Sequence, residues 1–301
     1  MASPRATQPK QPAEAWRIMR WRSRHWAHRE PLPTDAVGVA LTMLRIPAGS
    51  FEMGAPETEA ESSERERPVH RVTLGEFLLG QTPITQAQWR AVAQWQRLEH
   101  EDRELWPESM DPDPVAKLKD AEPFQAEQRP VVNVSWHDAM AFCQRLRLRT
   151  GKNYTLPSEA QWEYACRAGA TTPFHWGATI STELANCVGT IVYGDGDKGE
   201  YRRQTTDVAR FPANPWGLHD MHGNVLEWCA DNWQGNYKSV PEDGHAWIDE
   251  QAKDDPLKSR LLRGGSWVSS PRDCRSASRD FSHPNRRSRS IGFRVCCLPQ
   301  V

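Results

Sequence analysis

The segment LPSEAQWEYACRAG, residues 156–169, contains the complete signature of a short amphipathic helix. Ser158 is placed to cap the first turn, and Gln161, three residues later, is placed to complete a capping box. Gly169 follows the last apolar position and is the residue type that most often ends a helix. These residues predict one short helix with loops on both sides.

The same helix start occurs twice upstream. In PITQAQW (83–89) the expected cap is Thr85, and in VSWHDAMAFCQRL (134–146) it is Ser135. A polar residue that can complete a capping box, Gln or Asp, follows three residues after each cap. Three capped helices separated by long irregular stretches indicate an α+β domain with short strands, few helices and much ordered loop.

Other stretches predict strands and loops. Alternating apolar residues over 41–54 and 70–80 predict two strands, with an acidic loop over 57–66 between them. Residues 98–130 are acidic and dotted with proline, which predicts an insertion on the surface.

Composition limits the function classes. Hydrophobic residues make up 38% of the 301 residues and charged residues 26%, with a formal net charge of -1. We therefore expect a globular protein with neither a membrane span nor the basic field of a nucleic-acid-binding protein. The start of the chain lacks an apolar signal core, so we expect a cytoplasmic protein. The 14 tryptophans predict core residues, and the seven cysteines predict reduced, mostly buried thiols.

We divide the chain into a basic arm, residues 1–37, and one domain, residues 38–301. The stretch from Ala13 to His28 has the composition of a helix that carries arginine and tryptophan. Such an arm can bind nucleic acid or lipid, pack on the domain or stay mobile, and we do not expect nucleic acid.

Seven collinear motifs resemble the formylglycine-generating-enzyme, or sulfatase-modifying-factor, family. They are FEMG (51–54), PITQAQW (83–89), PVVNVSWHDAMAFCQRL (130–146), LPSEAQWEYACRAG (156–169), NPWGLHDMHGNVLEWCADNW (214–233), LLRGGSW (261–267) and IGFRV (291–295). They cover the chain from about residue 40 to residue 297. The resemblance implies an elaborated C-type-lectin-like fold, which agrees with the α+β pattern above.

The resemblance also indicates which chemistry is missing. Members that oxidise a substrate cysteine hold copper(I) with two cysteines that follow the GGS(Y/W) motif, because soft thiolates suit this ion. Here Ser269 stands at the first of these positions, and only Cys274 lies near the second. Relatives of the ergothioneine type carry an additional iron-binding domain with clustered histidines, whereas the arm has only His25 and His28. We therefore expect neither copper nor catalysis.

The resemblance further implies a structural calcium site. The matching positions are Asp220, Gly223 and Val225 through their carbonyl oxygens, and Glu227, which together offer the oxygen ligands that calcium prefers. Asn186, with Asp195 or Asp197, is a weaker candidate for a second site. The alternative for Glu227 is an ion pair with a buried arginine such as Arg263.

The segment VSSPRDCRSASRDFSHPNRRSRS (268–290) has an unusual composition. Its 23 residues include no Lys, Glu, Gln, Met or Trp. Codons of the form NNC cannot encode those same residue types. Adenine-directed mutagenesis by a diversity-generating retroelement produces such codons, and the segment resembles the variable region of the variable proteins of these elements.

This resemblance divides the carboxy-terminal region, residues 260–297, into two sets of positions. The expected variable, ligand-binding positions are Val268, Ser269, Ser270, Asp273, Ser278, Asp280, Phe281, Ser282, His283, Asn285, Ser288, Arg289 and Ser290. The expected fixed scaffold comprises Arg263, Gly264, Gly265, Trp267, Arg275, Ala277, Arg279, Gly292, Phe293 and Arg294.

The sequence therefore predicts a non-catalytic ligand-binding protein with a diversified carboxy-terminal surface. We expect the unknown ligand to be a protein or another macromolecule. The alternatives are an oxidoreductase like the formylglycine-generating enzyme, or an inactive or regulatory homologue of it.

Overall fold

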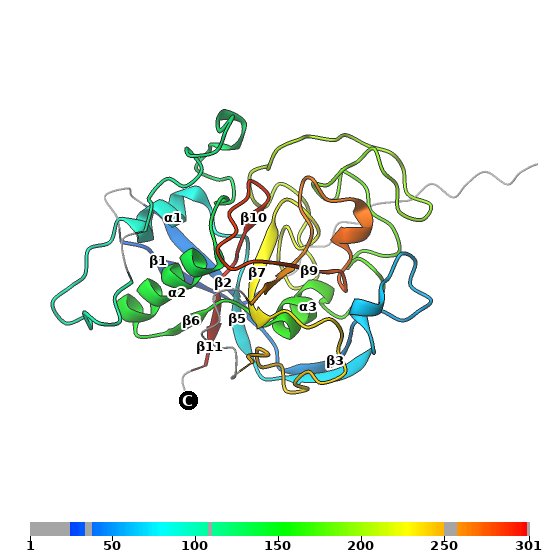
Figure 1. The fold of residues 1–301 in the computed structure, drawn as a ribbon, viewed down its shortest axis with the longest axis horizontal. Helices are drawn as coiled ribbons and strands as arrows, with labels where there is room; N and C mark the ends of the chain where they lie inside the picture. The colour runs from blue at the N-terminus through cyan, green and yellow to red at the C-terminus, as the bar shows by residue number, and fades with distance from the viewer. Residues whose placement is uncertain (1–24, 34–37, 108–109, 250–257, 300–301) are drawn as a thin grey trace, which may run out of the picture.

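The computed structural model describes residues 25–33, 38–107, 110–249 and 258–299. A five-stranded sheet has the order β1-β2-β5-β11-β6, and every neighbouring pair in it is antiparallel. Its strands are β1 (Ala27–Pro31), β2 (Ala40–Ile46), β5 (Phe77–Gly80), β6 (Asn153–Thr155) and β11 (Cys296–Leu298). The last strand of the chain therefore lies inside this sheet, between strands contributed by earlier parts of the sequence (Figure 1).

A second sheet contains three strands of the carboxy-terminal region. It has the order β10-β7-β8-β9 and consists of β7 (Leu226–Asn232), β8 (Arg260–Arg263), β9 (Arg279–Ser282) and β10 (Ile291–Gly292). The short strand β10 runs parallel to β7, whereas β8 is antiparallel to both of its neighbours. A separate hairpin pairs β3 (Gly49–Met53) with β4 (His70–Leu74).

Within the described ranges the chain forms three α-helices, and each begins at its predicted cap. They are α1 (Gln86–Ala93), α2 (Trp136–Thr150) and α3 (Glu159–Arg167), and all three have a complete capping box. At the start of α3, the backbone N–H of Gln161 donates to Ser158 Oγ at 3.1 Å, and Ser158 N–H donates to Gln161 Oε1 at 2.9 Å. The helix ends at Ala168 and Gly169, whose φ angles of 46° and 92° are left-handed.

The two predicted strand regions are confirmed, but each is divided in two. Residues 41–54 become β2 and β3, and residues 70–80 become β4 and β5. The acidic loop between β3 and β4 contains a short 3-10 helix, η1 (Glu64–Glu66). Two further 3-10 helices are η2 (Glu122–Phe124) and η4 (Pro271–Cys274).

The prediction of a surface insertion over 98–130 is wrong in one respect. Val115 and Phe124 are buried in the main hydrophobic cluster, and the Phe124 ring lies 5.6 Å from that of Trp267. The charged residues around them dominate the composition and conceal the few apolar side chains that pack inward.

The five-stranded sheet also extends into the range assigned to the basic arm. Strand β1 pairs with β2 over five residues, so Ala27 and His28 are extended rather than helical. The rest of the predicted arm helix, up to residue 24, lies outside the described residues. In the part of the chain that the structure describes, no helix is long and apolar enough to cross a membrane.

All seven cysteines are buried and free, as expected of reduced thiols. Cys296 and Cys297 lie in the closing strand β11, where Cys296 pairs with Leu79 of β5 and Thr155 of β6. Among the tryptophans, Trp89, Trp162 and Trp228 are fully buried in the core, whereas Trp26 is 58% exposed.

Candidate ligand-binding surface

The carboxy-terminal region separates into exposed and buried positions. None of the thirteen predicted variable residues is buried, and the most exposed among them include Val268, Asp280, Phe281, Asn285 and Arg289. All ten predicted scaffold residues are buried. In Figure 1 the segment that carries both sets is coloured orange to red. It lies beside β7, with which its strand β10 pairs, before the chain enters β11.

Three arginines outside the predicted set share the exposed side. Arg272, Arg286 and Arg287 are exposed between variable positions, and Arg287 forms an ion pair with Asp138 at the start of α2. Their charge, within the polar segment 268–290, is the signal that would have identified them as surface residues.

Arg263 is held at the centre of the molecule. Its guanidinium is fully buried and forms an ion pair with Glu163 of α3, and it donates to the carbonyl oxygen of Ser276 at 2.9 Å. Burial raises the pKa of Glu163, but the positive charges of Arg167 and Arg263 outweigh burial and keep this pKa below its ordinary value. The contact fixes β8 to α3 and to the turn that leads into β9.

Arg279 fixes the other end of that turn. Its Nε and Nη2 donate to the two carboxylate oxygens of Glu159 at 2.6 and 2.8 Å, a bidentate geometry. Its Nη1 donates to the carbonyl oxygens of Arg65, at 2.7 Å, and Gln234, at 3.0 Å. Arg279 thus joins β9 to two loops that lie far from it in the sequence.

Arg275 anchors the segment to the acidic loop. It donates to Glu59 Oε1 at 2.6 Å and to both carboxylate oxygens of Glu66 at 2.8 Å. Burial raises the pKa of Glu59 despite the opposing charge of Arg275. The sequence predicted this loop only as acidic, so its role as the partner of Arg275 was missed.

The fourth scaffold arginine, Arg294, forms a buried ion pair with the carboxylate of Glu227. Arg294 Nε and Nη2 donate to Glu227 at 2.6 and 2.7 Å, and the Trp162 indole N–H donates to the same carboxylate at 2.8 Å. Both oxygens of Glu227 are therefore used inside the protein, and this residue does not fit a calcium ligand. The alternative of a buried arginine partner applies, with Arg294 in the place suggested for Arg263.

Other predicted calcium ligands retain free oxygens. Asp220 Oδ2 accepts from the backbone N–H of Ala209 at 2.8 Å, while its buried Oδ1 has no protein partner. Burial raises the pKa of Asp220 to about 6. The side-chain oxygen of Asn186 is likewise buried without a partner, and its amide donates to Asn224 at 3.3 Å.

The remaining parts of the predicted calcium sites are weaker. The Gly223 carbonyl oxygen accepts from the Val225 N–H at 2.9 Å, while Asp195 and Asp197 are exposed, unlike the buried Asn186. Among the described residues, no group of three or more His, Cys, Asp and Glu side chains is arranged to hold a metal ion. Any cation here would depend largely on amide and backbone oxygens.

The position that corresponds to the first copper ligand does not fit copper. The Ser269 hydroxyl lies 3.0 Å from the Ser266 hydroxyl and accepts from the Ser266 backbone N–H at 3.0 Å. A neutral, hydrogen-bonded hydroxyl is a poor ligand for a soft ion. Cys274 is fully buried, and its nearest sulfur neighbour is Cys187 in a small aromatic cluster.

Trp267 supports the start of the exposed segment. Its side chain is 2% exposed, and its indole N–H donates to the carbonyl oxygen of Arg289 at 3.1 Å. The same ring contacts Phe124 and lies beneath the Arg289 guanidinium, 5.3 Å from the ring centre. One buried ring thereby fixes both ends of the stretch between residues 268 and 289.

An aromatic platform stands on the exposed side of β9. Phe281 stacks on Trp233 with ring centres 4.5 Å apart, and Arg65 lies over both rings at 5.7 and 5.8 Å. Trp233 and Arg65 were not predicted to belong to the surface. Arg, Trp and other aromatic side chains are the types that carry much of the energy of protein interfaces.

Most of the chain is similar to known proteins of one family. Residues 29–297 match the model of the sulfatase-modifying factor enzyme 1-like domain. The hercynine oxygenase of Mycolicibacterium smegmatis is 30% identical over 88% of this chain, which spans 63% of that protein's length. The formylglycine-generating enzyme of Mycobacterium tuberculosis is also 30% identical, over 85% of this chain and 98% of its own length.

A solved structure shares the fold. Treponema denticola variable protein 1 superposes with a TM-score of 0.65 and 22% identity, over 91% of this chain and 99% of its own. The matches confirm the predicted α+β, C-type-lectin-like fold with short strands and few helices. They also confirm the two resemblances on which the sequence analysis relied.

Proposed function

Given that this chain belongs to the family of sulfatase-modifying factor enzyme 1-like proteins, we propose that it is a non-catalytic ligand-binding protein. In this proposal residues 260–297 form the binding region, and the exposed side chains of 268–290 contact the ligand. The ligand is a protein or another macromolecule. The fold shared with the family forms the scaffold, and the exposed segment determines which ligand is bound.

The observation that carries the proposal is the separation of exposed from buried positions. A surface that differs between copies of a gene must tolerate substitution, and exposed positions typically change stability by no more than about 0.5 kcal/mol. The variable set is wholly outside the buried class, whereas the scaffold set is wholly within it. Loops on a rigid support are also where binding residues concentrate.

We further propose that a retroelement diversifies the exposed positions. The absence of Lys, Glu, Gln, Met and Trp from residues 268–290 supports this. The test is to sequence the DNA around the gene and its 3′ end in many cells. A near-copy of codons 260–297 with adenines at the differing positions, beside a reverse-transcriptase gene, is expected. A constant 3′ end without such a copy would contradict diversification.

A second candidate function is oxidation of a cysteine in a peptide, which the formylglycine-generating relatives favour. The Cys187 thiol interacts with that of Cys274, and this interaction lowers the pKa of Cys187. Both thiols are almost completely buried, which denies a peptide access to them. Copper-loaded protein incubated with a cysteine peptide should give no aldehyde, and aldehyde formation that is lost in Cys274→Ala would establish the enzyme instead.

We also propose one structural calcium ion beside Asp220. The free oxygens of Asp220 and Asn186 support it, and the carbonyl oxygens of Gly223 and Val225 complete the proposed ligand set. Glu227 is excluded from this set by its contacts with Arg294. When bound, the ion would neutralise the buried carboxylate of Asp220.

A further inference from the structure

A cavity adjoins the aromatic platform outside the variable segment. It has a volume of about 470 Å³ and is lined by residues of two loops, 55–69 and 235–238. Arg65 of the first loop lies over the platform, and Trp233 precedes the second loop by two residues. The cavity and the platform therefore share both of their supporting loops.

The cavity is preformed because hydrogen bonds of Tyr237 hold the two loops that form its walls. The backbone N–H of Tyr237 donates to the carbonyl oxygen of Arg67 at 2.8 Å, which joins the two loops. The buried Tyr237 hydroxyl donates to Glu159 at 2.9 Å, and Glu159 also holds Arg279. A cavity that does not need to order itself loses less affinity on binding.

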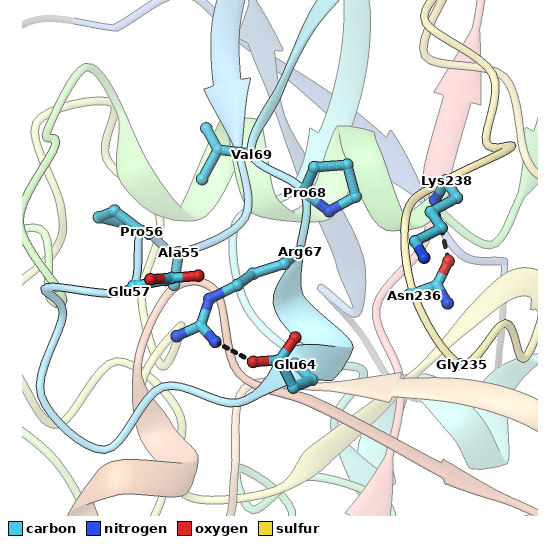
Figure 2. A pocket seen from close by; sticks show the side chains of 10 residues that line it. All are labelled: Ala55, Pro56, Glu57, Glu64, Arg67, Pro68, Val69, Gly235, Asn236 and Lys238. Atoms are coloured by element: carbon cyan, nitrogen blue, oxygen red, sulfur yellow. Dashed lines mark hydrogen bonds and ion pairs between the residues drawn. The ribbon is translucent and has the colours of Figure 1, made fainter.

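The lining combines apolar residues with charged side chains on opposite sides. Pro56, Pro68 and Val69 supply apolar surface, and Val69 is 38% exposed. Figure 2 shows Glu57 on one side of Arg67, and Lys238 with Asn236 on the other side of the cavity. Arg67 itself is tied to Glu64 at 2.7 Å and to Ser62 at 2.7 Å.

These charges select among the classes of ligand. The lining carries two acidic side chains, Glu57 and Glu64, and two basic ones, so it lacks the excess of positive charge that attracts a phosphate backbone or an anionic lipid surface. Apolar residues together with an acidic side chain on one side and a basic one on the other suit an extended peptide segment with an aliphatic side chain at its centre. The platform of Arg65, Trp233 and Phe281 has the composition of a protein-interface hot spot.

We propose that this cavity is a constant subsite of the ligand surface that binds a short segment of a protein. The segment places an aliphatic side chain against Pro56, Pro68 and Val69, a basic residue toward Glu57, and an acidic residue toward Lys238. The proposal rests on the proposed function, because the variable residue Phe281 would contact the same ligand. One part of the ligand surface is then identical in every copy, and only the other part changes.

The test begins with a random twelve-residue peptide library displayed on phage and selected on the full chain. Enriched peptides should share a basic–aliphatic–acidic pattern. Val69→Glu should lower the affinity for these peptides at least tenfold. Val192→Glu, at a valine of similar exposure (39%), should leave this affinity unchanged. Lys238→Glu should change the selected pattern from an acidic to a basic residue at the third position, a result that general unfolding cannot produce.

Phe281→Ala separates the failure of this proposal from that of the proposed function. If Phe281→Ala lowers the affinity for the peptides and Val69→Glu does not, the subsite is overturned and the role of the variable segment stands. If only Val69→Glu lowers this affinity, the subsite is supported and the role of the variable segment is contradicted. No enrichment, or a pattern unchanged by Lys238→Glu, would overturn the subsite.

Discussion

Arg263 and Arg289 belong to the same carboxy-terminal segment but lie in opposite surroundings. Arg263 has no exposed surface, and its guanidinium is bound by Glu163 and by backbone carbonyl oxygens. Arg289 is exposed, and its guanidinium lies over the ring of Trp267. The same contrast holds between the ten predicted scaffold positions, which are buried, and the thirteen predicted variable positions, which are exposed or partly exposed. The segment thus keeps its stabilising contacts and its contact surface on different residues.

The contrast explains how side chains on this surface could change without a change of fold. Each of the four scaffold arginines is paired with carboxylates from earlier parts of the chain. A buried ion pair is weak evidence for net stability, but losing one partner costs much more because the other charge stays buried. The pairs therefore enforce one path of the backbone while the exposed side chains remain free to differ.

The largest expected effect is at Arg263. Arg263→Met removes a buried cation and leaves Arg167 as the one cation among the described residues that is paired with Glu163, beside the backbone N–H of Gly54. The free energy of unfolding should therefore fall by about 5 kcal/mol. Denaturation by urea measures the change, with the exposed Arg286→Met as the matched control. Equal, small effects in the two variants would remove the distinction between scaffold and surface.

Trp267→Ala tests the same distinction with an apolar side chain. Loss of the buried ring and of its contacts with Phe124 should cost about 3 to 5 kcal/mol. Val268→Ala, at the next residue, should change the free energy of unfolding by less than about 0.5 kcal/mol. The prediction fails if Trp267→Ala unfolds at the same urea concentration as the wild-type protein.

Asp220 tests the scaffold through pH. Because burial raises the pKa of Asp220 to about 6, the folded protein holds this proton more tightly than the unfolded chain. Without calcium, the free energy of unfolding should therefore fall by roughly 3 kcal/mol from this group as the pH rises from about 4 to above 6. Asp220→Asn should lack this contribution.

The measurement is urea denaturation at several pH values in the presence of EDTA. Asp231, whose pKa burial raises to about 7, is unchanged in both proteins, so their difference isolates Asp220. Added calcium should stabilise the wild-type protein more than Asp220→Asn. Equal responses of the two proteins to calcium would exclude the proposed ion.

A smaller effect on stability than at Arg263, Trp267 or Asp220 is expected at Phe281. Phe281→Ala removes the stack on Trp233 and should cost about 1 kcal/mol or less, because the ring is 38% exposed. Thermal unfolding checks this. A loss comparable to that in Trp267→Ala would place Phe281 among the supporting residues instead.

Local features of the fold could be predicted from the sequence. Each capping box involves residues only three positions apart, so Ser158 and Gln161 identify the start of α3 without tertiary information. The starts of α1 and α2 followed from the same short pattern. The β1 strand and the inward-facing Val115 could not be found this way, because their neighbours in sequence are polar or proline-rich.

The partners of the scaffold arginines could not be predicted. Arg275 and Glu59 are 216 residues apart, and Arg263 and Glu163 are 100 residues apart. The sequence identified the arginines as fixed, but many carboxylates were available to each of them. Trp233 was missed for the same reason, since its contact with Phe281 exists only after β7 and β9 join the same sheet.

The order of these contacts along the chain has a consequence for biosynthesis. Glu59, Glu66, Glu159, Glu163 and Glu227 are all translated before the arginines that pair with them. A nascent chain that ends before Arg263 carries these acids without their partners, and β11 is missing from the five-stranded sheet. A frameshift or premature stop in the last codons therefore yields a polypeptide that cannot complete its core. Proteases that degrade unfolded chains would therefore remove such truncated products.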